Sequence, residues 1–213
     1  MMSKVFRIKS LIGFILLPFL IACGPLIEFP GSGEAPRHFQ LSPKDLALHA
    51  TVLEDGEIVT IYMENISSSG VLKTTSILVH AGSNELQYYE NALWVDRTPI
   101  LVSRFLTEAL SSGSGVRVVS ADSIEIPAQY RLKIDLRDFS LATGGSPEVK
   151  INLSAMLVRN GPVEVMATKE FKVEKRIAND EMDNVVSGFN NAMDNVAQQI
   201  AIWVQNSLHH KTS

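Results

Sequence analysis

Residues that could carry out a reaction are few in this sequence, and their spacing fits no common catalytic arrangement. A cysteine nucleophile needs a base beside it, and a zinc site needs several His or Cys ligands at short, regular spacing. The only cysteine is Cys23, and no His-Glu-x-x-His motif occurs. The scattered histidines are His38, His49, His80, His209 and His210. We therefore predict that the protein is not an enzyme and holds no metal or other cofactor.

Two weaker arrangements have simpler explanations than chemistry. His209 and His210 are adjacent and could bind a metal ion, but they lie in a polar C-terminal stretch, residues 206–213, that reads as a solvated tail. Asp96 and Glu108 are acids near the two ends of a predicted helix. Asp96 is interpreted as a helix cap and Glu108 as a surface residue, so neither is assigned a catalytic role.

The first 22 residues have the layout of a cleavable secretory signal. Lys4, Arg7 and Lys9 precede an apolar run from Leu11 to Ile21. An α-helix needs about 20 apolar residues to cross a bilayer, so this run is too short for a permanent membrane span. We predict a signal peptide over residues 1–22 and expect another device to hold the mature chain at the membrane.

That device is predicted at Leu20-Ile21-Ala22-Cys23, which directly follows the apolar run. This motif resembles the lipobox of bacterial lipoproteins, in which the cysteine is acylated and becomes the first mature residue. The alternatives are a buried thiol or a disulfide, and a disulfide within the chain is excluded because Cys23 has no second cysteine to pair with. Several acyl chains on Cys23 would give lasting attachment. By resemblance to Gram-negative sorting, Gly24 in place of Asp favours the outer membrane, with the domain facing the periplasm.

The rest of the mature chain divides into a tether and one domain. Residues 23–36 combine the lipidated cysteine with Gly, Pro and Ser, which predicts a flexible tether. Residues 37–205 are long enough for one domain with a sizeable core. Three of the 19 basic residues lie in the signal, which leaves 16 against 23 acids and a net charge of −7. This balance argues against nucleic acid as a partner.

Hydrophobic periodicity predicts an α+β fold. Alternating apolar and polar residues indicate strands, and the clearest run from Tyr130 to Leu136, where Phe139 then breaks the phase, from Val149 to Leu157 and from Val163 to Val173. Asn160-Gly161 is the expected hairpin turn between the last two. Shorter strands are expected at 39–41, 58–63, 76–80, 85–89 and 116–119.

Two amphipathic helices complete the predicted domain. The first starts near Asp96, Thr98 or Pro99 and buries Val102, Phe105, Leu106, Ala109 and Leu110. The second follows a cap at Asn179 or Asp180 and buries Val185, Phe189, Met193, Val196, Ile200 and Trp203. These elements predict a mixed, largely antiparallel sheet with both helices packed on one face.

Several segments resemble the ABC-type transport auxiliary lipoprotein family. They are Asn84–Pro99 running into the helix Ile100–Leu110, Tyr130–Phe139, Ala167–Phe171, Val185–Ala192 and Ile202-Trp203. The resemblance covers most of residues 37–205, while residues 43–74 fit the pattern poorly. It implies the outer-membrane lipoprotein of a mammalian-cell-entry (MCE) type lipid transport system, with an MCE-domain periplasmic protein and ABC transporter subunits as partners. The implied cargo is a phospholipid or a sterol-like lipid. The chain has no Gly-rich phosphate loop with its Lys, so ATP hydrolysis would belong to another subunit.

Two binding roles follow, together with a third role without transport. A docking subunit would grip its partner through exposed Tyr88, Tyr89, Trp94 and Arg97, since aromatic and Arg residues are enriched at interface hot spots. Core packing is the alternative for the aromatic residues, and an ion pair with Asp96 or Glu90 is the alternative for Arg97. A lipid carrier would instead need an apolar cavity of several hundred Å³. The third possibility is a structural envelope lipoprotein.

Overall fold

The computed structural model describes residues 35–44, 58–82, 84–112, 116–120 and 126–209. The predicted signal, the lipidation site Cys23 and nearly all of the tether lie outside these residues, as do residues 210–213. The described elements are β1 (Arg37–Phe39), β2 (Val59–Met63), β3 (Ser67–Ser68), the 3-10 turn η1 (Gly70–Leu72), β4 (Ser76–His80), β5 (Leu86–Trp94), α1 (Thr98–Ser111), β6 (Val116–Ser120), β7 (Tyr130–Ala142), β8 (Glu148–Asn160), β9 (Val163–Arg176) and α2 (Met182–His209).

Strand β7 organises the sheet because it is paired along both edges. One edge pairs with β8 in antiparallel fashion over its whole length, and β8 pairs in turn with β9. The other edge pairs with three short parallel strands in succession, namely β2 at Tyr130–Leu132, β3 at Asp135-Leu136 and β4 at Ser140–Ala142. Strand β6 lies beyond β2, while β5 and then β1 lie beyond β4. Five of the eight strand pairings among the described residues are thus parallel, and the three antiparallel pairings include the two longest.

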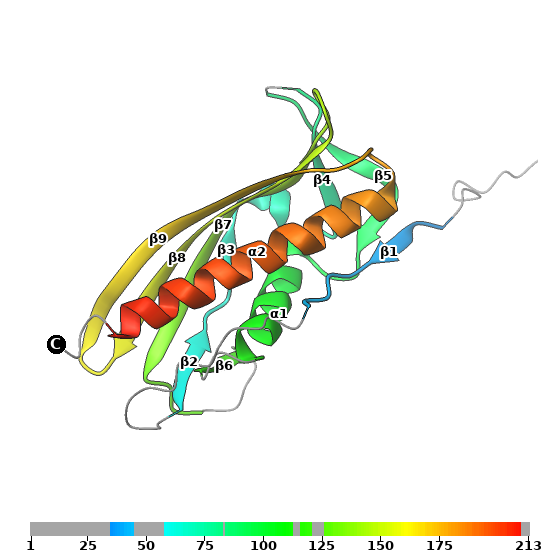
Figure 1. Cartoon of the computed structure of the whole chain (residues 1–213). Helices are drawn as coiled ribbons and strands as arrows, with labels where there is room; N and C mark the ends of the chain where they lie inside the picture. Colours follow the sequence, from blue (N-terminus) through cyan, green and yellow to red (C-terminus); the bar gives the residue numbers. More distant parts are fainter. Residues whose placement is uncertain (1–34, 45–57, 83, 113–115, 121–125, 210–213) are drawn as a thin grey trace, which may run out of the picture. The chain divides into compact units, whose positions relative to one another are not determined.

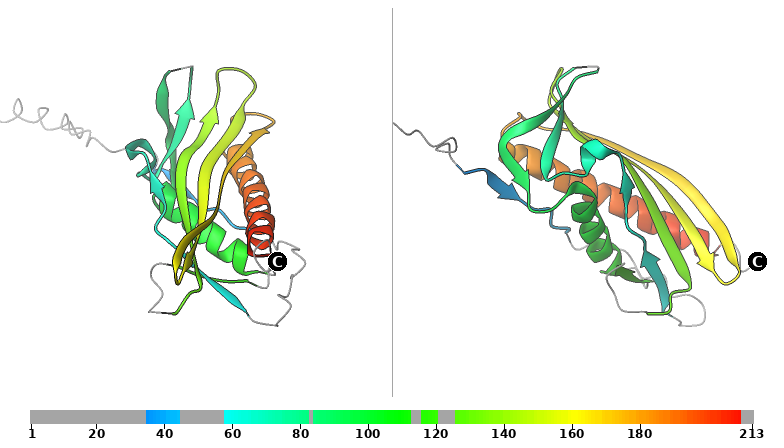
Figure 2. Two further views of the ribbon diagram at one scale, coloured as in Figure 1. Left: turned by 90° about the vertical axis from the view of Figure 1, so that its left-hand side faces the viewer. Right: turned by 180° about the vertical axis from the view of Figure 1, so that it is seen from behind.

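Both helices lie on the same face of this sheet, as Figures 1 and 2 show. The residues that alternate along β7 and β8 explain this arrangement, because Leu132, Ile134 and Leu136 of β7 point to the helices and are at most 3% exposed. The five predicted apolar residues of α1 are all buried, and those of α2 are buried except Trp203, which is half-buried. The predicted α+β class, with a mixed sheet and two helices on one face, is confirmed. No helix among the described residues combines the length and apolar character needed to cross a bilayer.

Three details differ from the sequence-based expectations. The break in alternation at Phe139 is not the end of a strand, because β7 continues through an irregularity between Leu136 and Asp138 and returns Phe139 to the buried face. The β8–β9 turn consists of Gly161 and Pro162, one residue later than expected. Helix α2 continues to His209, so residues 206–209 are helical and do not belong to a polar tail.

Strand β1 and the segment after it connect the N-terminal end of the domain to α2 through side-chain contacts. Arg37 pairs with Asp183 at 3.0 Å, and the backbone N–H of Ser42 donates to Asn190 Oδ1 at 2.9 Å. Lys44 Nζ donates to Asn191 Oδ1 at 2.9 Å. We call residues 37–44 the N-terminal strap. It joins the point where the predicted tether enters the domain to the first half of α2.

The sheet face opposite the helices is polar and carries exposed ion pairs. Arg137 contacts Asp135 on its own strand and Glu170 on β9. Lys172 Nζ lies 2.7 Å from Glu174 Oε1 further along β9. Their hydrogen bond and mutual charge raise the pKa of Lys172 and lower the pKa of Glu174. Burying this charged face against an apolar partner would therefore be unfavourable.

The Lys172–Glu174 pair gives a testable titration. Glu174 has a lowered pKa in the folded protein, so its contribution to stability is present above the unfolded value of about 4.3 and is lost as the pH falls through the folded value. Lys172 acts in the opposite sense, and its contribution is lost as the pH rises through its raised pKa. We expect Lys172→Ala to return the Glu174 pKa toward its ordinary value, which carboxyl-carbon NMR titration measures. An unchanged Glu174 pKa would contradict this assignment.

Candidate functional site

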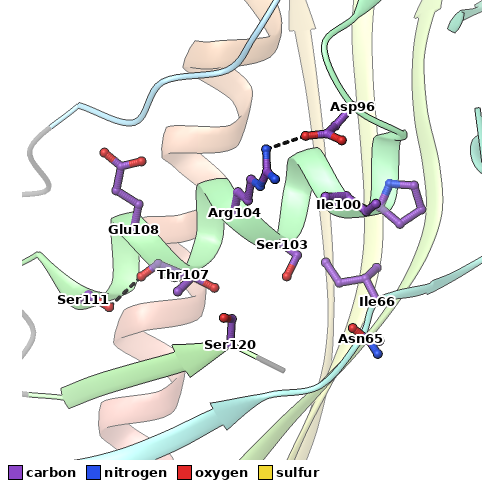
Figure 3. Close-up of a pocket in the computed structure, with 11 residues that line it drawn as sticks. Asn65, Ile66, Asp96, Ile100, Ser103, Arg104, Thr107, Glu108, Ser111 and Ser120 are labelled. Carbon is purple, nitrogen blue, oxygen red and sulfur yellow. Dashed lines mark hydrogen bonds and ion pairs between the residues drawn. The ribbon is translucent and has the colours of Figure 1, made fainter. Parts of the chain in front are cut away.

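A groove of about 760 Å³ runs along the outward face of α1. Helix α1 forms one wall, and the segment after β2 together with the end of β6 lies across from it (Figure 3). The wall residues of α1 follow from its periodicity, because burying Val102, Phe105, Leu106 and Ala109 turns the opposite positions outward. The lining residues are Asn65, Ile66, Asp96, Pro99, Ile100, Ser103, Arg104, Thr107, Glu108, Ser111 and Ser120.

Residues with small hydroxyl side chains line the middle of the groove, although the hydroxyl oxygen of Thr107 is itself buried. Ser103, Thr107 and Ser111 recur every four residues along α1, and Ser120 faces them from β6 (Figure 3). The Ser111 hydroxyl donates to the Thr107 carbonyl at 2.7 Å and lies 3.4 Å from the Val118 carbonyl. It therefore bonds to backbone carbonyls, whereas a serine nucleophile needs a basic side chain as its partner.

One ion pair and one further acid set the charge of the groove. Asp96 is bound by Arg104, one of the groove-wall residues of α1 (Figure 3). Asp96 is consequently not the helix cap that was expected, and the cap position is taken by Arg97 without a side-chain hydrogen bond. Glu108 is exposed and has no ion pair with any described residue. The described lining residues thus include two acids and one base.

The four residues predicted to bind a partner do not form one surface. Trp94 is 1% exposed and packs edge-on against Phe139 and Phe189, with ring centroids 6.0 and 5.3 Å away. Phe139 and Phe189 stack on each other at 4.5 Å. Trp94 therefore belongs to the core, which is the alternative that the sequence left open. In this conformation it is not available to a partner.

The other three predicted residues lie at separate places on the surface. The Tyr88 ring is exposed, and its hydroxyl donates to the Val71 carbonyl at 3.2 Å. Tyr89 is half-buried and donates to the Asp180 carbonyl at 2.9 Å, which links β5 to the segment before α2. Arg97 is exposed, and the alternative explanation, an ion pair with Asp96 or Glu90, is not observed, because Asp96 pairs with Arg104. Arg97 lies next to the groove in sequence, between Asp96 and Pro99.

Apolar side chains of the described residues pack between the sheet and the helices. An apolar pocket between Ile61, Leu132 and Val204 has a volume of only about 10 Å³.

Asn179, one of the two predicted caps, accepts a hydrogen bond from the Glu181 backbone N–H just ahead of α2. No group of three His, Cys, Asp or Glu side chains that could hold a metal ion occurs in the described part of the chain.

The groove was not predicted from the sequence, although the sequence contains a pattern that could have indicated it. Ser103, Thr107 and Ser111 have the four-residue spacing of one helix face, and this face lies opposite the apolar stripe. Such a row of small hydroxyl residues is also typical of an ordinary solvated helix. Only the position of β6 and of the segment after β2 turns this row into one wall of a groove.

Solved structures share this fold at low sequence identity. A protein of Xanthomonas campestris superposes with a TM-score of 0.68 at 19% identity, covering 84% of this chain and 97% of its own. A hypothetical protein of Chlamydia trachomatis reaches 0.53 at 7% identity, covering 73% of this chain and 100% of its own. These likenesses establish the fold alone.

Two sequence comparisons address the family. An uncharacterised protein of Bradyrhizobium diazoefficiens is 29% identical over 116 residues, which are 54% of this chain and 31% of that protein. The chain thus spans about a third of the length of this relative. The model of the family described as ABC-type transport auxiliary lipoprotein component matches residues 39–201. Because this match includes most of the chain, the protein belongs to the family of ABC-type transport auxiliary lipoprotein components.

Proposed function

We propose that this protein is a non-catalytic outer-membrane lipoprotein of an MCE-type lipid transport system, and that it docks the periplasmic part of the transporter at the outer membrane. Its family makes it an envelope lipoprotein that accompanies an ABC transporter. The lipobox at Cys23 and Gly24 after it support lipid attachment and the choice of membrane. The MCE-domain protein and the lipid cargo follow from the resemblance in sequence.

The small volume of the apolar pocket between Ile61, Leu132 and Val204 is the observation that favours docking over carrying lipid. Ligand pockets commonly enclose about 300–1,000 Å³, lined mainly by apolar groups. The apolar pocket between sheet and helices has only about 10 Å³, too little for an acyl chain. The groove beside α1 is large enough, but eight of the eleven described residues that line it are polar or charged. The described residues therefore suit a protein surface as partner better than a buried lipid chain.

The hydrogen bonds of the groove support a role without catalysis. Ser111 donates to backbone carbonyls, and Asp96 is bound by Arg104, so neither forms a nucleophile with a base. In the proposed system, ATP hydrolysis belongs to another subunit. Of the residues proposed for docking, Tyr88 and Arg97 are exposed, and Tyr89 offers only part of its ring beside its bond to Asp180. We retain Tyr88, Tyr89 and Arg97 and remove Trp94 from the proposed set.

Purification of the full-length protein from its own host tests this proposal. Membranes are solubilised in mild detergent, and mass spectrometry then identifies the co-purified subunits and the intact N-terminus. We expect an MCE-domain protein, ABC transporter subunits and an acylated N-terminal Cys23. Arg97→Ala and Tyr88→Ala should reduce recovery of the transporter subunits, while Lys172→Ala on β9 serves as the control and should not.

Two other results would overturn parts of the proposal. Acylated Cys23 without any transporter subunit would leave the anchor standing and favour a structural envelope lipoprotein. An unmodified chain that still begins at Met1 would exclude both the cleaved signal and the lipid anchor.

A further inference from the structure

The groove beside α1 has an apolar end and an acidic end. Pro99 and Ile100 lie in the first turn of α1, where Ile100 is 43% exposed, and Ile66 lies across from them in the segment after β2 (Figure 3). The Asp96–Arg104 ion pair borders the same end. Glu108 lies two turns further along the helix (Figure 3). Between these ends, the Ser103 side chain faces the groove (Figure 3), whereas the Thr107 hydroxyl is buried and the Ser111 hydroxyl is bonded to backbone carbonyls. A ligand that fills the groove therefore meets apolar side chains at one end and the Ser103 hydroxyl in the middle.

The length of the groove fits a short extended peptide. An α-helix rises about 1.5 Å per residue, so the wall from Ile100 to Ser111 is about 17 Å long. An extended chain covers about 3.3 Å per residue, which places roughly five residues along that wall. The main chain of such a segment presents N–H and C=O groups in alternation. The Ser103 hydroxyl can both donate and accept, so it matches either kind of group.

The charge of the lining selects among possible ligands. Arg104 is the one base among the described lining residues, and its pairing with Asp96 weakens its attraction for a phosphate group. Glu108 has no ion pair within the described residues and would repel an anionic lipid headgroup. A Lys or Arg side chain beside Glu108 would instead be attracted.

We propose that this groove binds an extended segment of about five residues from a partner protein, with an aliphatic side chain at Ile66 and Ile100 and a basic side chain beside Glu108. This inference rests on the proposed docking function, because it assigns the chemistry of the docked segment. It predicts how that segment is oriented along α1, with its aliphatic side chain at the start of the helix and its basic side chain near the end of the helix.

The test uses the isotopically labelled full-length protein in mild detergent and two capped pentapeptides. Each has leucine at one end and three serines in the middle, and the other end is lysine in one peptide and glutamate in the second. Both sequence orders are used. We expect the lysine peptide to shift the NMR amide signals of Ser103, Thr107 and Ser111 with a Kd of about 1 mM, and the glutamate peptide to bind about fivefold more weakly.

Three variants make the result specific to the groove. Glu108→Lys should reverse the preference between the two peptides, whereas Glu174→Lys, the same charge change on β9, should leave it unaltered. Ser103→Trp fills the groove from an outward position and should abolish the shifts from both peptides, with the helix content unchanged by circular dichroism. These three outcomes together would support the proposal.

Other outcomes would overturn it. The groove does not take a peptide if its amide signals stay in place at about 5 mM peptide, or if the lysine preference survives Glu108→Lys. Stronger shifts of the same amides with glycerol 3-phosphate would indicate a lipid headgroup as the ligand. Because this experiment needs only the purified protein, its failure is distinct from a failure to recover transporter subunits.

Discussion

Replacing Trp94 with alanine is expected to lower the free energy of unfolding by about 3–5 kcal/mol. Trp94 is 1% exposed and connects β5 to Phe139 of β7 and Phe189 of α2. Its removal leaves a cavity where the sheet and the longer helix meet, and the edge-to-face contacts with both rings are lost. Surrounding side chains are closely packed, so they can fill the cavity only in part.

Urea unfolding of the full-length protein, followed by far-ultraviolet circular dichroism, measures this loss. Trp203→Ala is the matched control, because Trp203 is half-buried and contacts one ring, that of Phe171, at 5.7 Å. We expect a clearly smaller loss for this control. If Trp94 acted on a partner, Trp94→Ala would instead weaken recovery of the partner without lowering stability. Equal losses for the two tryptophans would argue against the aromatic cluster as a centre of the core.

Replacing Gly188 with alanine is expected to destabilise the protein by about 1–3 kcal/mol, although alanine is the better helix former. A Cβ atom at this position would lie 2.5 Å from Ile177 Cγ2 and 3.1 Å from Val149 Cγ2. Isoleucine is stiff at this methyl group because it is branched at Cβ. Val149 is fully buried on β8, so it cannot move aside without disturbing the sheet. Gly188 therefore permits the close approach of α2 to the sheet.

A double-mutant cycle with Ile177→Ala separates this clash from other effects. Ile177→Ala removes the atom at 2.5 Å, so Gly188→Ala should be much less destabilising in that background. The neighbouring change Ser187→Ala, on the exposed side of α2, should alter the midpoint of urea unfolding little. Additive effects of Gly188→Ala and Ile177→Ala would contradict the steric explanation.

The sequence predicted those elements whose side chains have a regular period. The alternation from Tyr130 to Leu136 predicted the start of β7, and the stripe on α1 predicted its buried face. Strand β3 was not predicted, because Ser67 and Ser68 join the sheet through backbone pairing with Asp135 and Leu136 and have no apolar pattern. The order of the strands was also beyond prediction, because periodicity does not specify which strands become neighbours.

The candidate site was less predictable than the fold. Trp94 was ambiguous in sequence, because aromatic side chains are common both in cores and at interfaces. The close approach of Phe139 and Phe189 resolves this ambiguity, and both come from distant parts of the chain. The groove depends in the same way on the positions of Ile66 and Ser120 relative to α1, which no local pattern reports.

The three short strands along one edge of β7 have a consequence for the order in which the protein can fold. If the chain is exported with its N-terminus first, as its proposed signal requires, β2, β3 and β4 emerge 62 to 69 residues before the positions of β7 that pair with them. During that interval β4 can pair with β5 and β2 with β6, but the edges that later bind β7 stay open. From β7 onward, by contrast, the long hairpins and α2 join near neighbours in the chain. The N-terminal half is therefore the part of the protein that most needs protection from aggregation before it is complete.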